Sequence, residues 1–159
     1  PVVANGDITS PEKARDVLAF TGADAVMVGR AAQGRPWIFG DIAHFLATGE
    51  HRAAPLTWQV KQWLLEHLED HYGLYGEFAG VRTARKHIGW AVRALPGGED
   101  FRAHMNLLDT STDQVRAVGQ FFDQLAAEHD RLPAPRDGGT GLDDEEQAQN
   151  AHTAACHVN

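Results

Sequence analysis

The chain has 159 residues, 43% of them hydrophobic and 23% charged, and its formal net charge is −8 at pH 7. This is the composition of an ordinary soluble globular chain, and no apolar run approaches the roughly 20 residues that span a bilayer. The single cysteine, Cys156, excludes intrachain disulfides and agrees with a reducing compartment. We therefore expect a cytoplasmic protein without a membrane segment.

The first thirty residues predict a strand, a helix and a second strand. Residues 1–4 and 23–28 are short apolar runs, and their continuous apolar character predicts parallel strands buried on both faces. Ser10 is the expected N-cap of the helix between them, with Pro11 at its first position and Gly22 at its C-terminal cap. The helix face toward the sheet should carry Ala14, Val17, Leu18 and Thr21.

A loop suited to an anion follows each predicted strand. Asn5, Gly6 and Asp7 follow the first strand, and Gly29 and Arg30 follow the second. Glycine lets backbone N–H groups come close to an anion, and arginine can add a charge-assisted contact. A plain turn and a helix start are the simpler alternatives. Two such loops at neighbouring strand ends nevertheless favour a phosphate site, as β/α barrels build after strands seven and eight.

Residues 1–48 are interpreted as the end of a barrel whose earlier strands are missing. The chain starts inside a strand, and one βαβ unit leaves both sheet edges exposed. A helix from Pro36 should complete this part, with an apolar stripe of Trp37, Ile38, Ile42, Phe45 and Leu46. Trp37 could instead line a cleft. Residues 49–55 are polar with Gly and Pro, and we interpret them as a linker.

Residues 56–130 predict an all-α bundle of helices over about 56–75, 78–95, 99–108 and 110–125. Thr57 is the expected N-cap of the first. The inner face of the last should carry Val115, Val118, Phe121, Phe122 and Leu125. His67 and His71 could share a metal ion, but without a third ligand in the same turn we expect no metal. Residues 131–159 are predicted to form a disordered acidic tail.

The second predicted helix carries a row of cations. Arg82, Lys86, Gly89 and Arg93 fall on one side at 100° per residue, and Arg85 lies between them and the apolar face. No acidic partner stands at i, i+4 within the helix, so phosphate contact is favoured over a solvated face. Gly89 is expected to let a phosphate approach the backbone. The candidate phosphate-binding cations are Arg82, Arg85, Lys86 and Arg93.

Three segments also carry a family resemblance. They are Ala4-Asn5-Gly6-Asp7-Ile8, the run from Thr21 through Gly29-Arg30 to Ala32, and Gly34-Arg35-Pro36-Trp37-Ile38-Phe39. Together they resemble the end of the flavin barrel of tRNA-dihydrouridine synthases, and residues 82–90 resemble the B-type bacterial branch. The resemblance implies that Asn5, Gly6, Asp7, Gly29 and Arg30 hold the phosphate of FMN. It also implies tRNA as partner, NADPH as reductant and a proton-donating cysteine upstream, which Cys156 does not match.

Three functions follow as hypotheses. The first is the carboxy-terminal part of an enzyme that reduces uridine to 5,6-dihydrouridine in tRNA, a monomer whose present chain alone would be inactive. The second is another FMN-dependent barrel oxidoreductase acting on a small molecule, against which the row of cations argues. The third is a helical RNA-binding module without its own activity, against which the paired loops argue.

Overall fold

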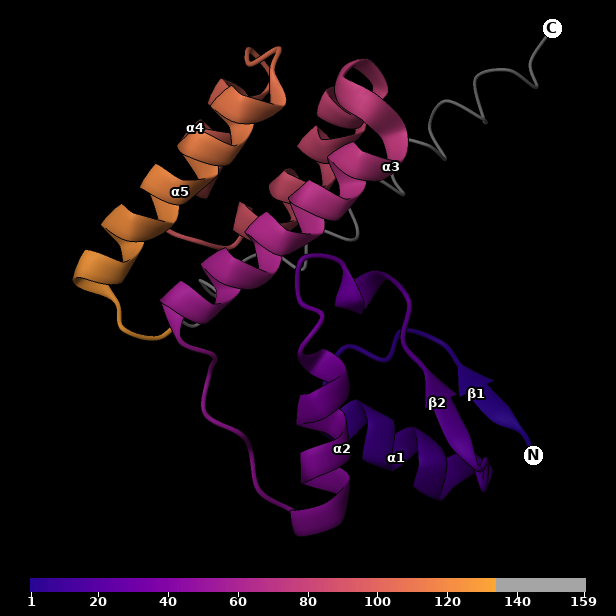
Figure 1. The fold of residues 1–159 in the computed structure, drawn as a ribbon. Coiled ribbons are helices and arrows are strands. Elements are labelled where there is room, and N and C mark those ends of the chain that lie inside the picture. The colour runs from indigo at the N-terminus through magenta and orange to yellow at the C-terminus, as the bar shows by residue number, and fades with distance from the viewer. Residues whose placement is uncertain (134–159) are drawn as a thin grey trace, which may run out of the picture.

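The computed structural model describes residues 1–133, which form a small α/β part followed by an all-helical part (Figure 1). The predicted tail lies, from residue 134 on, outside the described residues. No helix within residues 1–133 has the length and apolar character needed to cross a membrane. In chain order the elements are β1 Val3–Asn5, α1 Pro11–Thr21, β2 Ala25–Met27, the 3₁₀ helix η1 Arg30–Ala32, α2 Ile38–Thr48, α3 Thr57–Val92, α4 Gly98–Met105 and α5 Ser111–Glu128.

The opening strand, helix and strand are confirmed. β1 and β2 pair in parallel, with Ala4 opposite Val26. The hydroxyl of Ser10 accepts a hydrogen bond from the Lys13 backbone N–H at 3.2 Å, as an N-cap does. Gly22 ends α1 at φ 68°, in the left-handed region that glycine adopts at helix ends. Local sequence signals therefore set both ends of this helix.

The expectation that both strands are buried on both faces is wrong. Val26 packs against a buried cluster of Ile8, Ala14, Ile38 and Ile42, whereas its neighbour Met27 is 46% exposed. Side chains alternate between the faces of a strand, and α1 covers one face of this two-stranded sheet, with α2 packed against α1. The other face carries Val3 and Met27, which are 57% and 46% exposed, and no helix of the described residues packs on it (Figure 1).

α2 begins at Ile38, two residues later than predicted. The Ile38 N–H donates to the Arg35 carbonyl oxygen at 3.1 Å, so a tight turn occupies the predicted first helical positions. Ile38, Ile42 and Phe45 are buried as predicted. Leu46 is 43% exposed, however, so the apolar stripe ends at Phe45.

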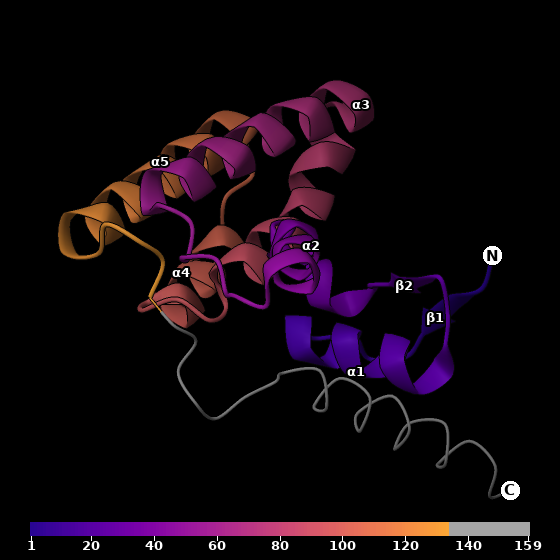
Figure 2. The same ribbon diagram turned by 90° about the horizontal axis from the view of Figure 1, so that it is seen from below.

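The two helices predicted over about 56–75 and 78–95 are confirmed as the two legs of α3, which are separated by a break at Gly76. Gly76 has φ 72° and ψ 173°, which is not helical, and the chain turns there so that its second leg leaves in a new direction (Figure 2). Thr57 is not the N-cap. Leu56 holds that position, and the buried Thr57 hydroxyl donates to the His129 carbonyl oxygen at 2.5 Å. The Thr57 side chain, which local signals assigned to capping, therefore makes a long-range hydrogen bond instead.

The helical part packs around a core drawn from α3, α4 and α5. Its buried residues are Val60, Leu64, Leu68, Ala84, Ile88, Val92, Met105, Val118, Phe122 and Leu125. Val115 is 37% exposed, contrary to prediction, and Gln114 is fully buried instead. The Gln114 amide donates to the Val81 carbonyl oxygen at 3.1 Å and accepts from the Tyr72 hydroxyl at 2.7 Å. Burial, with the nearby charge of Glu77, raises the pKa of Tyr72 to about 12.

The two parts of the structure meet through the turn before α2. Trp37 packs against the core of the helical part. Gly34 has φ 72°, and a Cβ there would collide with the carbonyl oxygen of Trp90 in α3. Only glycine therefore permits this close approach without strain.

The predicted boundary of the tail at residue 131 is also corrected. Arg131 forms an antiparallel bridge with Leu56, and the Leu132 N–H donates to the Pro55 carbonyl oxygen at 3.0 Å. These backbone bonds attach the residues after α5 to the end of the predicted linker. Residues 131–133 therefore belong to the folded part.

Candidate functional site

The two predicted phosphate loops lie side by side at the same edge of the sheet. Asn5 is opposite Met27 in the parallel register, so the segments that follow the two strands leave the sheet together. Gly6 has φ 147° and Asp7, a non-glycine residue, has φ 44°. The backbone after β1 therefore turns sharply. Parallel strands present their carboxyl ends on one edge, which is where α/β proteins bind ligands.

Arg30 and Asp7 join these two loops. Arg30 Nη2 lies 2.8 Å from Asp7 Oδ1, and their side chains are 47% and 74% exposed. Sequence reasoning placed both residues in the site but did not pair them, because they lie 23 positions apart in the chain. The ion pair orients the guanidinium, a planar group that carries five N–H donors.

The loops fit a phosphate group by the space that they leave. A Cβ built on Gly6 or Gly29 would meet nothing within 4 Å, so a ligand can approach the backbone at both positions. η1 begins directly after Gly29 and places Arg30 at its first residue. Backbone N–H groups beside an oriented guanidinium are the donor set that binds phosphate oxygens.

The cation row lies on the second leg of α3 and on Arg93, the residue that directly follows this helix. Arg82, Lys86 and Arg93 are exposed. The guanidinium of Arg82 lies 5.5 Å from the centre of the Phe78 ring, and Lys86 Nζ lies 5.0 Å from the centre of the Trp90 ring. An aromatic face attracts a cation without neutralising its charge. These three side chains therefore present positive charge at the surface.

Arg85 differs from the other three cations. Its Nη2 donates to the Leu108 carbonyl oxygen at 2.9 Å and lies 3.1 Å from Asp109 Oδ1, and its side chain is only 25% exposed. Arg85 Nε is buried and has no hydrogen-bond partner within the described part of the chain. The acidic partner, Asp109, lies in the segment between α4 and α5, so the sequence of α3 alone does not reveal it. Arg85 therefore fastens α3 to that segment.

The interpretation of Gly89 as an opening for phosphate is wrong. Gly89 is buried, and a Cβ there would lie 3.4 Å from Cδ of Arg102 in α4. Arg102 itself pairs with Glu99 at 2.7 Å. The glycine therefore makes room for a side chain of the same protein.

A cavity of about 220 Å³ opens beside the cation row, between the turn before α2 and both legs of α3. Its walls include three tryptophans, Trp37, Trp63 and Trp90, together with His67 and His87. Trp37 thus both packs on the core and lines a cleft, so the two alternatives for this residue coexist. Sequence reasoning missed the grouping because the three tryptophans come from segments far apart in the chain.

A parallel strand pair with adjacent loops at one edge, followed by a helical part, defines the architecture of this chain. Residues 1–127 match the family described as Dihydrouridine synthase (Dus), and the chain belongs to that family. Membership agrees with the resemblance seen in the residues of both loops and of α3.

Among curated relatives, the chain is similar to proteins named tRNA-dihydrouridine synthase B. It is 55% identical over 124 residues to that of Pseudomonas putida, which is 78% of this chain and 37% of the relative. It is 58% identical over 123 residues to that of Pseudomonas aeruginosa, covering 77% of this chain and 37% of the relative. It is 45% identical over 126 residues to that of Serratia marcescens, covering 79% of this chain and 38% of the relative. The chain therefore spans less than two fifths of the length of these relatives.

Proposed function

We propose that this chain is the carboxy-terminal part of an enzyme that reduces uridine to 5,6-dihydrouridine in tRNA, using FMN and NADPH. In this proposal residues 1–48 complete a β/α barrel, and the remaining strands cover the open face of the sheet. The observation that carries the proposal is the pair of adjacent loops, bridged by Asp7 and Arg30, in a chain of the dihydrouridine synthase family. The exposed cation row on the attached helical part gives it an RNA-facing surface.

The loops would hold the phosphate of FMN. Gly6 and Gly29 leave the backbone accessible, Asn5 ends β1 beside them, and Arg30 donates N–H groups to phosphate oxygens. The Asp7 carboxylate would repel a phosphate, so its role is to orient Arg30 through the 2.8 Å ion pair. Bound FMN supplies the hydride chemistry that protein side chains lack.

The helical part would hold tRNA. A uridine inside a folded tRNA must leave its stack before it reaches a flavin, so the protein has to grip the backbone around it. Arg82, Lys86 and Arg93 are exposed and fit phosphate contact. Arg85 would act differently, because its contacts with Leu108 and Asp109 position the helix that carries the other three.

The test of the flavin site is the variant Arg30→Ala in the longer protein of which this chain would be a part. Losing a charge-assisted hydrogen bond costs about 1.5–3 kcal/mol, so FMN affinity should fall roughly ten- to hundredfold. Flavin absorbance after gel filtration measures retention. Arg15→Ala is the matched control, since Arg15 is exposed and pairs with Asp16 at 2.8 Å in the same manner.

Unchanged flavin retention in Arg30→Ala would remove Arg30 from the site. Asp7→Asn should weaken retention less than Arg30→Ala, because the amide still accepts a hydrogen bond from the guanidinium. A clear gain of flavin binding in Asp7→Asn would show that the carboxylate has no orienting role. The present chain should form no dihydrouridine even with added flavin, and activity of the purified chain would contradict the proposed division of the protein.

A further inference from the structure

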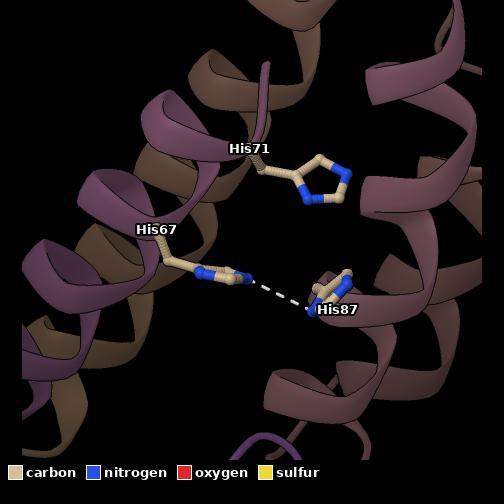
Figure 3. A group of neighbouring side chains, drawn as sticks. All are labelled: His67, His71 and His87. Carbon is tan, nitrogen blue, oxygen red and sulfur yellow. Dashed lines mark hydrogen bonds between the residues drawn. The ribbon is translucent and has the colours of Figure 1, made fainter. Parts of the chain in front are cut away.

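Three histidines from the two legs of α3 meet beside the tryptophan-lined cavity. His67 and His71 lie one turn apart on the first leg, and His87 faces them from the second leg (Figure 3). One ring nitrogen from each lies within 4.8 Å of the other two. The kink at Gly76 creates this cluster, because it brings residue 87 back beside residues 67 and 71.

The spacing of the ring nitrogens suits a metal ion. His67 Nε2 and His87 Nδ1 are 3.2 Å apart. Two nitrogens bound to one tetrahedral Zn²⁺ at about 2.0–2.1 Å lie about 3.3 Å apart, so this pair already has the separation of two ligands. His71 completes the set by a small rotation of rings that have room to move, because His67 is exposed and both His67 and His87 line the cavity.

A neighbouring hydroxyl holds His71 in the form that a metal requires. Thr83 Oγ1 lies 2.8 Å from the Ala79 carbonyl oxygen, to which it donates its hydrogen. Thr83 Oγ1 also lies 2.7 Å from His71 Nε2 and therefore accepts a hydrogen bond from that nitrogen. This leaves the lone pair of His71 Nδ1, and Figure 3 shows a ring nitrogen of His71 directed toward the other two histidines. Such a partner fixes the tautomer of metal-binding histidines in proteins.

The surroundings of the cluster favour the neutral form of His71 and His87. Burial, followed by the charge of His67, lowers the pKa of His71. Burial and then the charges of His67, His71 and Lys86 lower the pKa of His87. Neutral imidazole is the form that binds metal. The charge of Lys86, whose ammonium lies over the Trp90 ring, opposes a second cation, and direct coordination by three nitrogens has to outweigh it.

We propose that His67, His71 and His87 bind one Zn²⁺ ion. Three imidazoles leave a fourth position for water on the side of the cavity, which provides a path of entry. Metal binding replaces the hydrogen bond between His67 and His87 with two metal–nitrogen bonds. The proton of that hydrogen bond moves to the other nitrogen of the ring that donated it. The ion would tie the two legs of α3 together across Gly76.

The experiment is calorimetric titration of the metal-stripped chain with ZnCl₂ near neutral pH. We expect one equivalent to bind. His67→Ala, which alters an exposed residue and should fold normally, is expected to weaken binding by more than about 100-fold, because second-shell changes alone cost 10- to 100-fold. Thr83→Val should weaken binding by roughly 10- to 100-fold through His71. The matched control is His104→Ala, which removes an exposed histidine of α4 and should leave binding unchanged.

Thermal unfolding gives a second readout. Zn²⁺ should raise the melting temperature of the chain and of His104→Ala, a chelator should reverse the rise, and His67→Ala should show none, because a ligand stabilises only the state that binds it. Absence of saturable Zn²⁺ binding would overturn the proposal. So would equal affinity in His67→Ala and the unaltered chain, which would place the metal on other groups such as Cys156.

Discussion

Replacing Arg82, Lys86 and Arg93 with alanine separates an RNA-binding surface from a merely solvated one. All three side chains are exposed, Arg82 and Lys86 on the second leg of α3 and Arg93 directly after it, and they lie beside rather than within its buried face. Their aromatic neighbours, Phe78 and Trp90, leave the positive charge intact. Arg85 is left unaltered, because its bonds to the segment after α4 make it a structural residue.

The expected size of the effect follows from counterion release. The slope of log affinity against log salt changes by about 0.7 for each phosphate contact with single-stranded and 0.9 with duplex nucleic acid. Three lost contacts should therefore flatten the slope by roughly 2 to 2.7. If the wild type and the triple variant bind tRNA equally at 1 M salt, the triple variant would bind roughly 100- to 500-fold more weakly than the wild type at 0.1 M.

The assay is fluorescence anisotropy with labelled tRNA at several salt concentrations. A control with Lys13, Arg15 and Arg116 replaced by alanine removes the same charge from exposed positions on α1 and α5. Its slope should change little. The reasoning is refuted if the α3 variant keeps the wild-type slope, or if both variants flatten equally, since net charge alone would then explain the effect. Thermal unfolding should show similar stability for all three proteins.

Three further predictions concern stability. Gly34→Ala should lower the free energy of unfolding by more than about 2 kcal/mol, because left-handed backbone costs about 1–2 kcal/mol and the new Cβ strikes a carbonyl of α3; a loss below about 1 kcal/mol in urea would contradict this. Tyr72→Phe should cost about 1–3 kcal/mol by leaving the Gln114 oxygen unpaired, and adding Gln114→Met should recover part of the loss. Hydrogen bonds from the Ser111 hydroxyl and N–H lower the pKa of Glu77 below its ordinary 4.5. That stabilisation is present above the pKa of Glu77 in the unfolded chain and is lost as the pH falls through its pKa in the folded protein. The loss in free energy of unfolding caused by Glu77→Ala should therefore vanish in strong acid, and a difference that persists there would exclude the charge as its cause.

The sequence by itself determined the features that depend on a few consecutive residues. Ser10 and Pro11 start α1, and Gly22 ends it. The apolar periods of α2 and α5 placed most of the buried residues correctly. The order of strand, loop and helix likewise indicated that the two loops lie at one edge of the sheet. Capping, turn chemistry and periodicity act over one or two turns, so they can be read without knowing the fold.

Tertiary structure decided which side chains meet across longer distances. Arg30 pairs with Asp7, and Arg102 occupies the space beside Gly89. Arg85 forms an ion pair with Asp109 and so differs from the other cations of the row. The histidine cluster has the same origin, because the third ring arrives only when α3 turns at Gly76. A local pattern specifies which face of a helix is apolar, but the direction of the chain after a glycine break depends on how the whole core packs. The partners of polar side chains are therefore settled only when the segments on either side of the break have docked.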